Sequence, residues 1–192
     1  NFEIDIKEIL LDAKTLIWED DTVKVFGFPV DHRIPCYGYL FEEQQVQLNI
    51  RKEAITKYDL SIEEILKAKN AEPVIRNDKL ISQDKLTYPG QLPRSYAFCA
   101  DSRPNPKIID YIKNVDLLYF ESTYLNDLQP EADIRGHSTA SQAGNMALQS
   151  NAKKLIIGHY SSRYKDVNPL LEEAKSVFWD TELAYDGAVF NL

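Results

Sequence analysis

One stretch of sequence decides how the chain is interpreted: KLIIGHYSSRY, residues 154–164, a short apolar run followed by turn residues and polar side chains. The run KLII (154–157) predicts a buried strand with turn chemistry at its exit. A histidine at the end of such a strand, here His159, lies where α/β proteins bind ligands. Ser161 and Arg163 add a hydroxyl and a forked cation that suit a phosphate oxygen. We therefore predict a phosphate-handling site beside a metal or a general base. The alternative is a strand end whose His159 and Arg163 bond backbone carbonyls.

The chain contains three histidines, His32, His137 and His159, and each lies in a polar segment. Histidine is the commonest metal ligand and the usual general acid or base near neutral pH. His32 falls in a proline-bracketed loop between the predicted strands 23–28 and 36–41, so it is a candidate ligand. The alternative for His32 is a surface histidine in a hairpin.

Two further predicted strands end in acidic residues. Strand 94–100 ends at Asp101, strand 116–120 ends at Glu121, and the helix Pro106–Lys113 is expected between them. This βαβ order predicts parallel strands joined by a right-handed crossover, with both acids at the same sheet edge. A carboxylate held at a strand end is a rigidly placed metal ligand. The alternative is that each acid caps a helix.

The C-terminal part continues the alternation of strands and helices. His137 precedes a predicted helix over 140–151, which Ser138 or Thr139 can cap, and the strand 154–159 follows. We expect one more helix over 168–177. Further strands are expected at residues 2–6, 15–18, 182–185 and 188–191. The fold class is therefore α/β.

Residues 44–95 differ in character from the rest. Ser61 and Glu64 have the spacing of a capping box, which predicts a helix through Lys69. Basic residues are scattered here among nearly as many acids, so the simplest interpretation is a solvated excursion. The functional alternative is a protruding arm that touches an extended polyanion.

Composition limits the classes of protein. The chain has 192 residues, is 44% apolar and carries a net charge of −8, which argues against non-specific coating of nucleic acid. No apolar run approaches the roughly 20 residues that span a bilayer, and no signal-peptide pattern opens the chain. Cys36 and Cys99 are predicted to be reduced thiols, which suits a cytoplasmic location. Because the chain starts inside a predicted strand without a methionine, we expect a fragment of a longer protein.

The order of these segments resembles the ribonuclease Z family, the tRNA 3′-end processing endonucleases of metallo-β-lactamase fold. The matching segments are DHRIPCYGY (31–39), CADSRP (99–104), FEST (120–123), GHSTASQA (136–143) and GHYSSRY (158–164). The resemblance implies an αββα sandwich of which this chain supplies the C-terminal half. Residues 1–192 would form a partial metallo-β-lactamase domain with an inserted arm at about 44–95.

The resemblance also implies roles for individual residues. His32 and His159 would each bind one of two Zn²⁺ ions and Asp101 would bridge them. His137, oriented by Glu121, would protonate the leaving oxygen. Substrate phosphate would be held by Ser161 and Arg163. The partners implied are precursor tRNA, whose elbow the arm would grip, and a second copy of the protein in a homodimer.

Four departures from the family pattern limit what this chain can do. The ligand motif His-x-His-x-Asp-His is absent, and it belongs upstream of residue 1. Ser102 replaces a usual threonine, Phe120 replaces a usual histidine, and the arm lacks a Gly-Pro signature. Three ligands are too few for two zinc ions. We therefore expect an active parent enzyme, with residues 1–192 inactive without the missing N-terminal half of the domain.

Two other functions remain open from the sequence. One is another hydrolase of the same fold, a phosphodiesterase or a sulfatase that acts on small esters. The other is a non-catalytic fragment that binds RNA or a partner chain.

Overall fold

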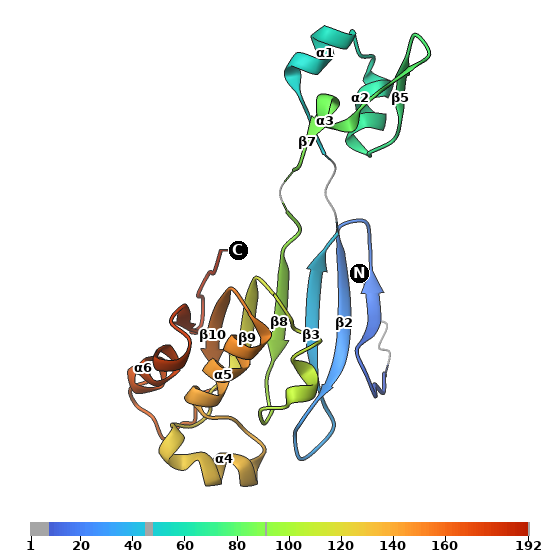
Figure 1. Cartoon of the computed structure of the whole chain (residues 1–192). Coiled ribbons are helices and arrows are strands. Elements are labelled where there is room, and N and C mark those ends of the chain that lie inside the picture. The colour runs from blue at the N-terminus through green and yellow to red at the C-terminus, as the bar shows by residue number, and fades with distance from the viewer. Residues whose placement is uncertain (1–7, 45–47, 91, 192) are drawn as a thin grey trace, which may run out of the picture. The chain divides into compact units, whose positions relative to one another are not determined.

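A computed structural model describes residues 8–44, 48–90 and 92–191 of the chain. The chain forms two compact units, one from Asn1–Glu43 with Arg94–Leu192 and one from Gln44–Pro93 (Figure 1). We call the first the sheet unit and the second the insert unit. The strand predicted at residues 2–6 lies outside the described residues.

The sheet unit is built on a mixed seven-stranded sheet in the order β1-β2-β3-β8-β9-β10-β11 (Figure 1). The first four of these strands pair antiparallel and the last four pair parallel. The strands are β1 Thr15–Glu19, β2 Val23–Val30, β3 Cys36–Glu43, β8 Ser95–Cys99, β9 Leu117–Glu121, β10 Lys154–Gly158 and β11 Thr181–Leu183. The predicted parallel pairing of residues 94–100 with 116–120 is confirmed. The carboxyl ends of β8, β9 and β10 therefore lie side by side.

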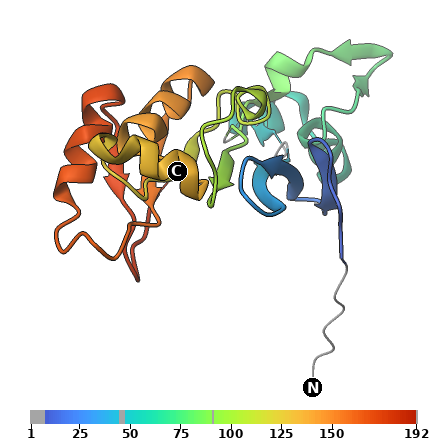
Figure 2. The same ribbon diagram turned by 90° about the horizontal axis from the view of Figure 1, so that it is seen from below.

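Helices cover one face of this sheet. The helices on this face are α5 Ala140–Ser150 and α6 Asn168–Val177. The unit also contains α4 Gln129–Arg135 and the short 3₁₀ turns η1 Pro106–Ile108 and η2 Asn126–Leu128. The α5 and α6 helices pack against each other and contact β9, β10 and β11 on the same side of the sheet (Figure 2). The predicted helix 168–177 is confirmed residue for residue.

The main core lies between these helices and the sheet. Alternate residues of a strand point to one face, and accordingly Leu118 and Phe120 of β9 and Leu155 and Ile157 of β10 are fully buried. Burying each such side chain contributes about 1.5–3 kcal/mol to the free energy of unfolding. This core holds β9 and β10 in fixed positions, and the carboxyl ends of these strands carry the site residues.

The insert unit has its own small core. Its elements are β4 Asn49–Ile50, α1 Lys52–Tyr58, α2 Ile62–Lys69, β5 Val74–Arg76, β6 Lys79–Ile81, α3 Gln83–Leu86 and β7 Thr87–Tyr88. The buried apolar residues of this core are Ala54, Leu60, Ala68, Val74 and Leu86. The predicted capping box is confirmed, because the Ser61 side chain accepts from the Glu64 amide and the Glu64 carboxylate accepts from the Ser61 amide.

Two of the predicted elements are wrong. Residues 106–113 form only the 3₁₀ turn η1 followed by isolated turn bonds to the Ile108 carbonyl, and the chain turns left-handed at Asn114. One turn buries Ile108 and Ile112 without a regular helix, and so short a helix gains little from propagation. Residues 188–191 form no strand, because the chain turns at Gly187 and no described strand pairs with them.

Within the described part of the chain, no helix is both long enough and apolar enough to cross a bilayer.

Candidate metal centre

The site forms where β8, β9 and β10 end. Asp101 follows β8 closely, Glu121 is the last residue of β9, and His159 follows β10 directly. Asp101 and His159 both adopt left-handed backbone conformations, with φ of 48° and 59°. Such conformations cost free energy for residues other than glycine. Here they occur where the chain leaves β8 and β10, and both side chains lie at the sheet edge.

His137 reaches the same edge from the turn between α4 and α5. The α4 helix ends at Gly136, which has φ of 83°. The α5 helix begins after Thr139, whose side chain accepts from the Gln142 amide while the Gln142 side chain accepts from the Thr139 amide. Of the two predicted caps, Thr139 is therefore the one used. His137 lies between these two fixed points.

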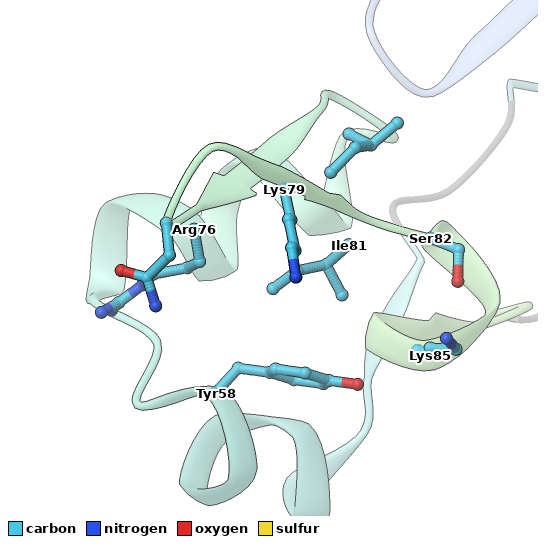
Figure 3. Close-up of a pocket in the computed structure, with 8 residues that line it drawn as sticks. Tyr58, Arg76, Lys79, Ile81, Ser82 and Lys85 are labelled. Atoms are coloured by element: carbon cyan, nitrogen blue, oxygen red, sulfur yellow. The ribbon is translucent and has the colours of Figure 1, made fainter.

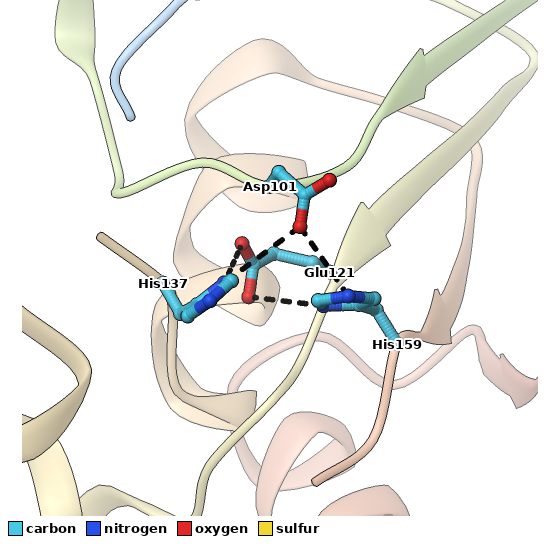
Figure 4. Close-up of side chains that lie close together, drawn as sticks. All are labelled: Asp101, Glu121, His137 and His159. Atoms are coloured by element: carbon cyan, nitrogen blue, oxygen red, sulfur yellow. Dashed lines mark hydrogen bonds and ion pairs between the residues drawn. The ribbon is translucent and has the colours of Figure 1, made fainter. Parts of the chain in front are cut away.

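These four side chains gather so closely that one ligand atom from each lies within 4.8 Å of the others (Figure 4). The Nε2 atom of His159 is 3.3 Å from Oδ1 of Asp101. The Nδ1 atom of His137 is 3.0 Å from Oε1 of Glu121 and 4.0 Å from Oδ1 of Asp101. The sequence expectation that both acids share one sheet edge is confirmed.

Glu121 is fully buried and held as an anion. Its Oε1 atom accepts from the Ser102 amide at 2.5 Å, and its Oε2 atom accepts from Thr123 Oγ1 at 2.5 Å and from the Ser138 amide at 3.1 Å. Burial raises the pKa of Glu121, but hydrogen bonds, above all from His137, outweigh it and lower the pKa to about 2. Because both oxygens are already engaged, Glu121 is suited to orienting its neighbours.

Hydrogen bonds to Glu121 and its neighbours set the tautomers of the two histidines at the sheet edge. A carboxylate only accepts, so the Nδ1–H group of His137 donates to Glu121. The short bond from Thr123 to Glu121 uses the hydroxyl proton, so Nδ1–H of His159 donates to Thr123 Oγ1 at 3.0 Å. Glu121 also raises the pKa of His159, against burial, which lowers it. In both rings Nε2 is the atom left for chemistry.

His32, which lies in a different part of the sheet unit, also has its Nδ1 atom bonded to a protein acceptor. Its Nδ1 atom lies 2.7 Å from the Gly136 carbonyl oxygen, which only accepts, so Nδ1 donates and Nε2 stays open. The structure does not bring His32 into the four-residue group, but its ring centroid is 5.1 Å from that of His137. The rings of His137 and His159 lie 5.2 Å apart.

The predicted phosphate residues Ser161 and Arg163 contact each other, and Arg163 also contacts Tyr124. Arg163 donates from Nε to Ser161 Oγ at 3.2 Å. Its guanidinium group stacks 4.9 Å from the Tyr124 ring, whose centroid is 6.4 Å from that of His137. Among the described residues Arg163 has no acidic partner within ion-pair distance, so its charge is available to an anion.

The donor atoms are of the kind that a metal ion takes. Zinc binds neutral imidazole nitrogens and carboxylate oxygens, and its histidine ligands usually donate their other N–H to a protein acceptor. Asp101 and His159 offer one oxygen and one nitrogen at the cluster, and His32 offers a further open Nε2. The residues present therefore fit part of a metal centre.

Sequence reasoning missed three contributors to this site. Thr123 links His159 to Glu121, Tyr124 carries the guanidinium of Arg163, and the Ser102 amide bonds Glu121. The threonine and tyrosine directly follow Glu121 in the sequence, but nothing in the spacing alone showed what they contact.

The chain is similar over most of its length to curated proteins named Ribonuclease Z. It is 41% identical over 181 residues to the protein of Porphyromonas gingivalis, covering 94% of this chain and 60% of that protein. It is 38% identical over 192 residues to the protein of Bacteroides thetaiotaomicron, covering all of this chain and 61% of that protein. The chain is homologous to ribonuclease Z. It spans about 60% of the length of these ribonuclease Z relatives, and no protein-family model matches it.

Solved structures show the same fold. The metallo-β-lactamase fold protein YhfI from Bacillus subtilis superposes with a TM-score of 0.62 at 17% identity, covering 96% of this chain and 55% of that one. The short form of human tRNase Z superposes with a TM-score of 0.56 at 20% identity, covering 93% of this chain and 46% of that one. The predicted metallo-β-lactamase fold is confirmed.

Proposed function

We propose that the whole protein is a zinc-dependent endoribonuclease that removes the 3′ trailer of precursor tRNA by two-metal phosphodiester hydrolysis. The observation that carries the proposal is the common arrangement of His32, His137 and His159. In each ring Nδ1 is bonded to a protein atom, which leaves Nε2 as the possible ligand or proton donor, and Nε2 of His159 faces Asp101 Oδ1 at 3.3 Å. The similarity to proteins named Ribonuclease Z supports the substrate class. We propose that the active form of this protein is a homodimer in the cytoplasm.

Asp101, His32 and His159 would hold the metal ions, with Asp101 shared between the two. Bound zinc supplies Lewis-acid activation of water and of the phosphate group. The sheet fixes Asp101 and His159 at adjacent strand ends, so little reorganisation is needed when the ligand set is completed. Residues 1–192 provide three of these ligands, and we propose that they do not turn over substrate by themselves.

His137 would act as the general acid. Its Nδ1–H bond to the buried Glu121 carboxylate orients the ring and leaves Nε2 for the proton transfer. A proton at Nε2 can pass to the leaving oxygen as the P–O bond breaks. Glu121 is thus a positioning residue, because it acts through His137.

Arg163 and Ser161 would hold the phosphate that is cleaved or one next to it. The guanidinium fork binds phosphate oxygens in pairs. Its guanidinium lies over the Tyr124 ring, and that ring is also a neighbour of the His137 ring, which supports this role. The negative charge of the whole chain is compatible with this function because these basic contacts are local.

Cleavage of a precursor tRNA by the zinc-loaded full-length protein tests the proposal. We expect release of a 3′ trailer, with a His137→Ala variant slower by about 100-fold or more. The matched control is Asn145→Ala, which changes an exposed residue of α5 and should leave the rate unchanged. Cleavage of bis(p-nitrophenyl) phosphate without cleavage of precursor tRNA would instead support the small-ester hydrolase. Absence of both activities would leave the non-catalytic binding function.

A further inference from the structure

The insert unit contains a hollow of about 500 Å³ that the catalytic proposal does not use (Figure 3). Its floor is Tyr58 at the end of α1, its wall is the β5–β6 hairpin, and α3 closes one side. The hollow is lined by Tyr58, Arg76, Asn77, Lys79, Leu80, Ile81, Ser82 and Lys85. Three of these are basic and none is acidic.

The hairpin geometry determines which side chains enter the hollow. Asn77 and Asp78 both have left-handed backbone, with φ of 49° and 56°, as a two-residue type I′ turn requires. Lys79 and Ile81 share one face because strand side chains alternate. Lys79 extends from the hairpin into the space above the Tyr58 ring (Figure 3).

The three basic side chains do not have the same role. Arg76 donates from Nε and Nη2 to the two carboxylate oxygens of Glu64, each at 2.9 Å, and Nη2 also donates to the Asp59 carbonyl. Arg76 therefore forms part of the wall of the hollow, and Glu64 neutralises its charge. Lys79 and Lys85 are exposed and have no acidic partner within ion-pair distance in the described part of the chain.

Tyr58 provides a flat surface next to these two charges. It is half-buried and packs against the small core of the insert unit, which fixes the plane of its ring. The Lys57 ammonium lies 5.3 Å from the ring centroid and adds to the positive charge around it. An aromatic ring beside unpaired ammonium groups matches a ligand with a planar base and a phosphate.

We propose that this hollow binds one nucleotide, with the base on the Tyr58 ring and the phosphate between Lys79 and Lys85. The nucleotide is either free or part of a single-stranded RNA, since both present the same base and phosphate. The site lies wholly within the insert unit, and its test measures binding. The outcome of that test is therefore independent of whether the proposed catalysis is correct.

Calorimetric and NMR titrations of the 192-residue chain test this site. The probes are AMP, ribose 5-phosphate and a short single-stranded oligoribonucleotide. Lys79→Ala and Lys85→Ala should each weaken binding by about 5- to 10-fold, because each removes one charge-assisted phosphate contact. Tyr58→Leu keeps an apolar side chain in the core and should abolish the preference for AMP over ribose 5-phosphate. Lys52→Ala is the matched control, since Lys52 is an exposed lysine of the same unit outside the hollow.

The results separate the two sources of ligand. AMP binding that depends on Lys79, Lys85 and Tyr58 identifies a free-nucleotide site. Binding of the oligoribonucleotide alone, with the same dependence, identifies a site for one nucleotide of a strand. Binding weakened equally by Lys52→Ala, or no saturable binding of any probe, would overturn the proposal and leave the lysines as a solvated face.

Discussion

The Oε1 atom of Glu121 lies 3.0 Å from Nδ1 of His137, and the carboxylate is fully buried. This relationship joins the end of a central strand to the turn before α5. It gives the histidine a defined tautomer, because an ionised carboxylate can only accept. The Ser102 and Ser138 amides and the Thr123 hydroxyl keep the carboxylate in place.

Glu121→Gln tests that relationship. The variant keeps the shape but removes the anion, so Nδ1–H of His137 loses its charged acceptor. We expect kcat for the proposed precursor tRNA cleavage by the full-length protein to fall by about 100-fold and the free energy of unfolding to fall by about 1–3 kcal/mol. Stopped-flow cleavage and urea unfolding measure the two effects. A positioning role also predicts a changed pH–rate profile, and an unaltered profile would contradict it.

Gly136→Ala tests the close approach of His32 to the α4 terminus. A β-carbon at Gly136 would lie 2.7 Å from Nδ1 of His32, in a backbone conformation with φ of 83°. The matched control is Gly187→Ala, because Gly187 has φ of 82° but nothing within 4 Å of its β-carbon position. Both changes should cost about 1–2 kcal/mol of backbone strain. Urea unfolding should show a larger loss in the free energy of unfolding for Gly136→Ala than for Gly187→Ala. The Gly136→Ala change should also shift the His32 NMR signals. Equal costs would show that His32 does not need the glycine.

Asp101→Asn tests the proposed metal ligand without losing the left-handed backbone, which asparagine tolerates. Removing the anionic oxygen beside His159 should weaken zinc binding to the chain by about tenfold or more, measured by competition with a chromophoric chelator. Asp133→Asn, an exposed change on α4, is the control. Unchanged zinc affinity in Asp101→Asn would show that Asp101 is not a zinc ligand.

Thr139→Ala tests the cap of α5. Thr139 is buried and caps the helix through a reciprocal bond with Gln142. Losing the cap should lower the free energy of unfolding by about 1 kcal/mol, seen as a lower urea midpoint at unchanged slope. Thr139→Ser keeps the hydroxyl and should retain most of the stability. If the serine variant loses as much as the alanine variant, packing rather than capping is responsible.

The insert unit should lose stability in acid through Glu64. Hydrogen bonds, chiefly from Arg76, lower the pKa of Glu64 from 4.5 to about 2. Because the folded pKa is lowered, the stabilisation is complete above about pH 4.5 and is lost as the pH falls towards 2. Carboxyl-carbon NMR gives the pKa of Glu64 directly. The stability difference between wild type and Glu64→Gln should shrink as the pH falls through 2.

The sequence by itself determined much of the local structure and the candidate residues. The helix over 168–177 and the capping box at Ser61 were predictable because caps and periodicity are local properties. The meeting of Asp101 and Glu121 was predictable because parallel strands joined by a right-handed crossover end at one edge. The segment 106–113 was not, because burial of Ile108 and Ile112 by the core decided its conformation.

Only the tertiary structure decided what each site residue contacts. Three histidines were visible in the sequence, but the bond of His32 to Gly136 joins residues 104 positions apart. The same holds for Thr123 with His159 and for Arg163 with Tyr124. Spacing along the chain selects residue types that can do chemistry. Packing of the strands and turns around them sets the tautomer, the charge and the direction in which each open atom points.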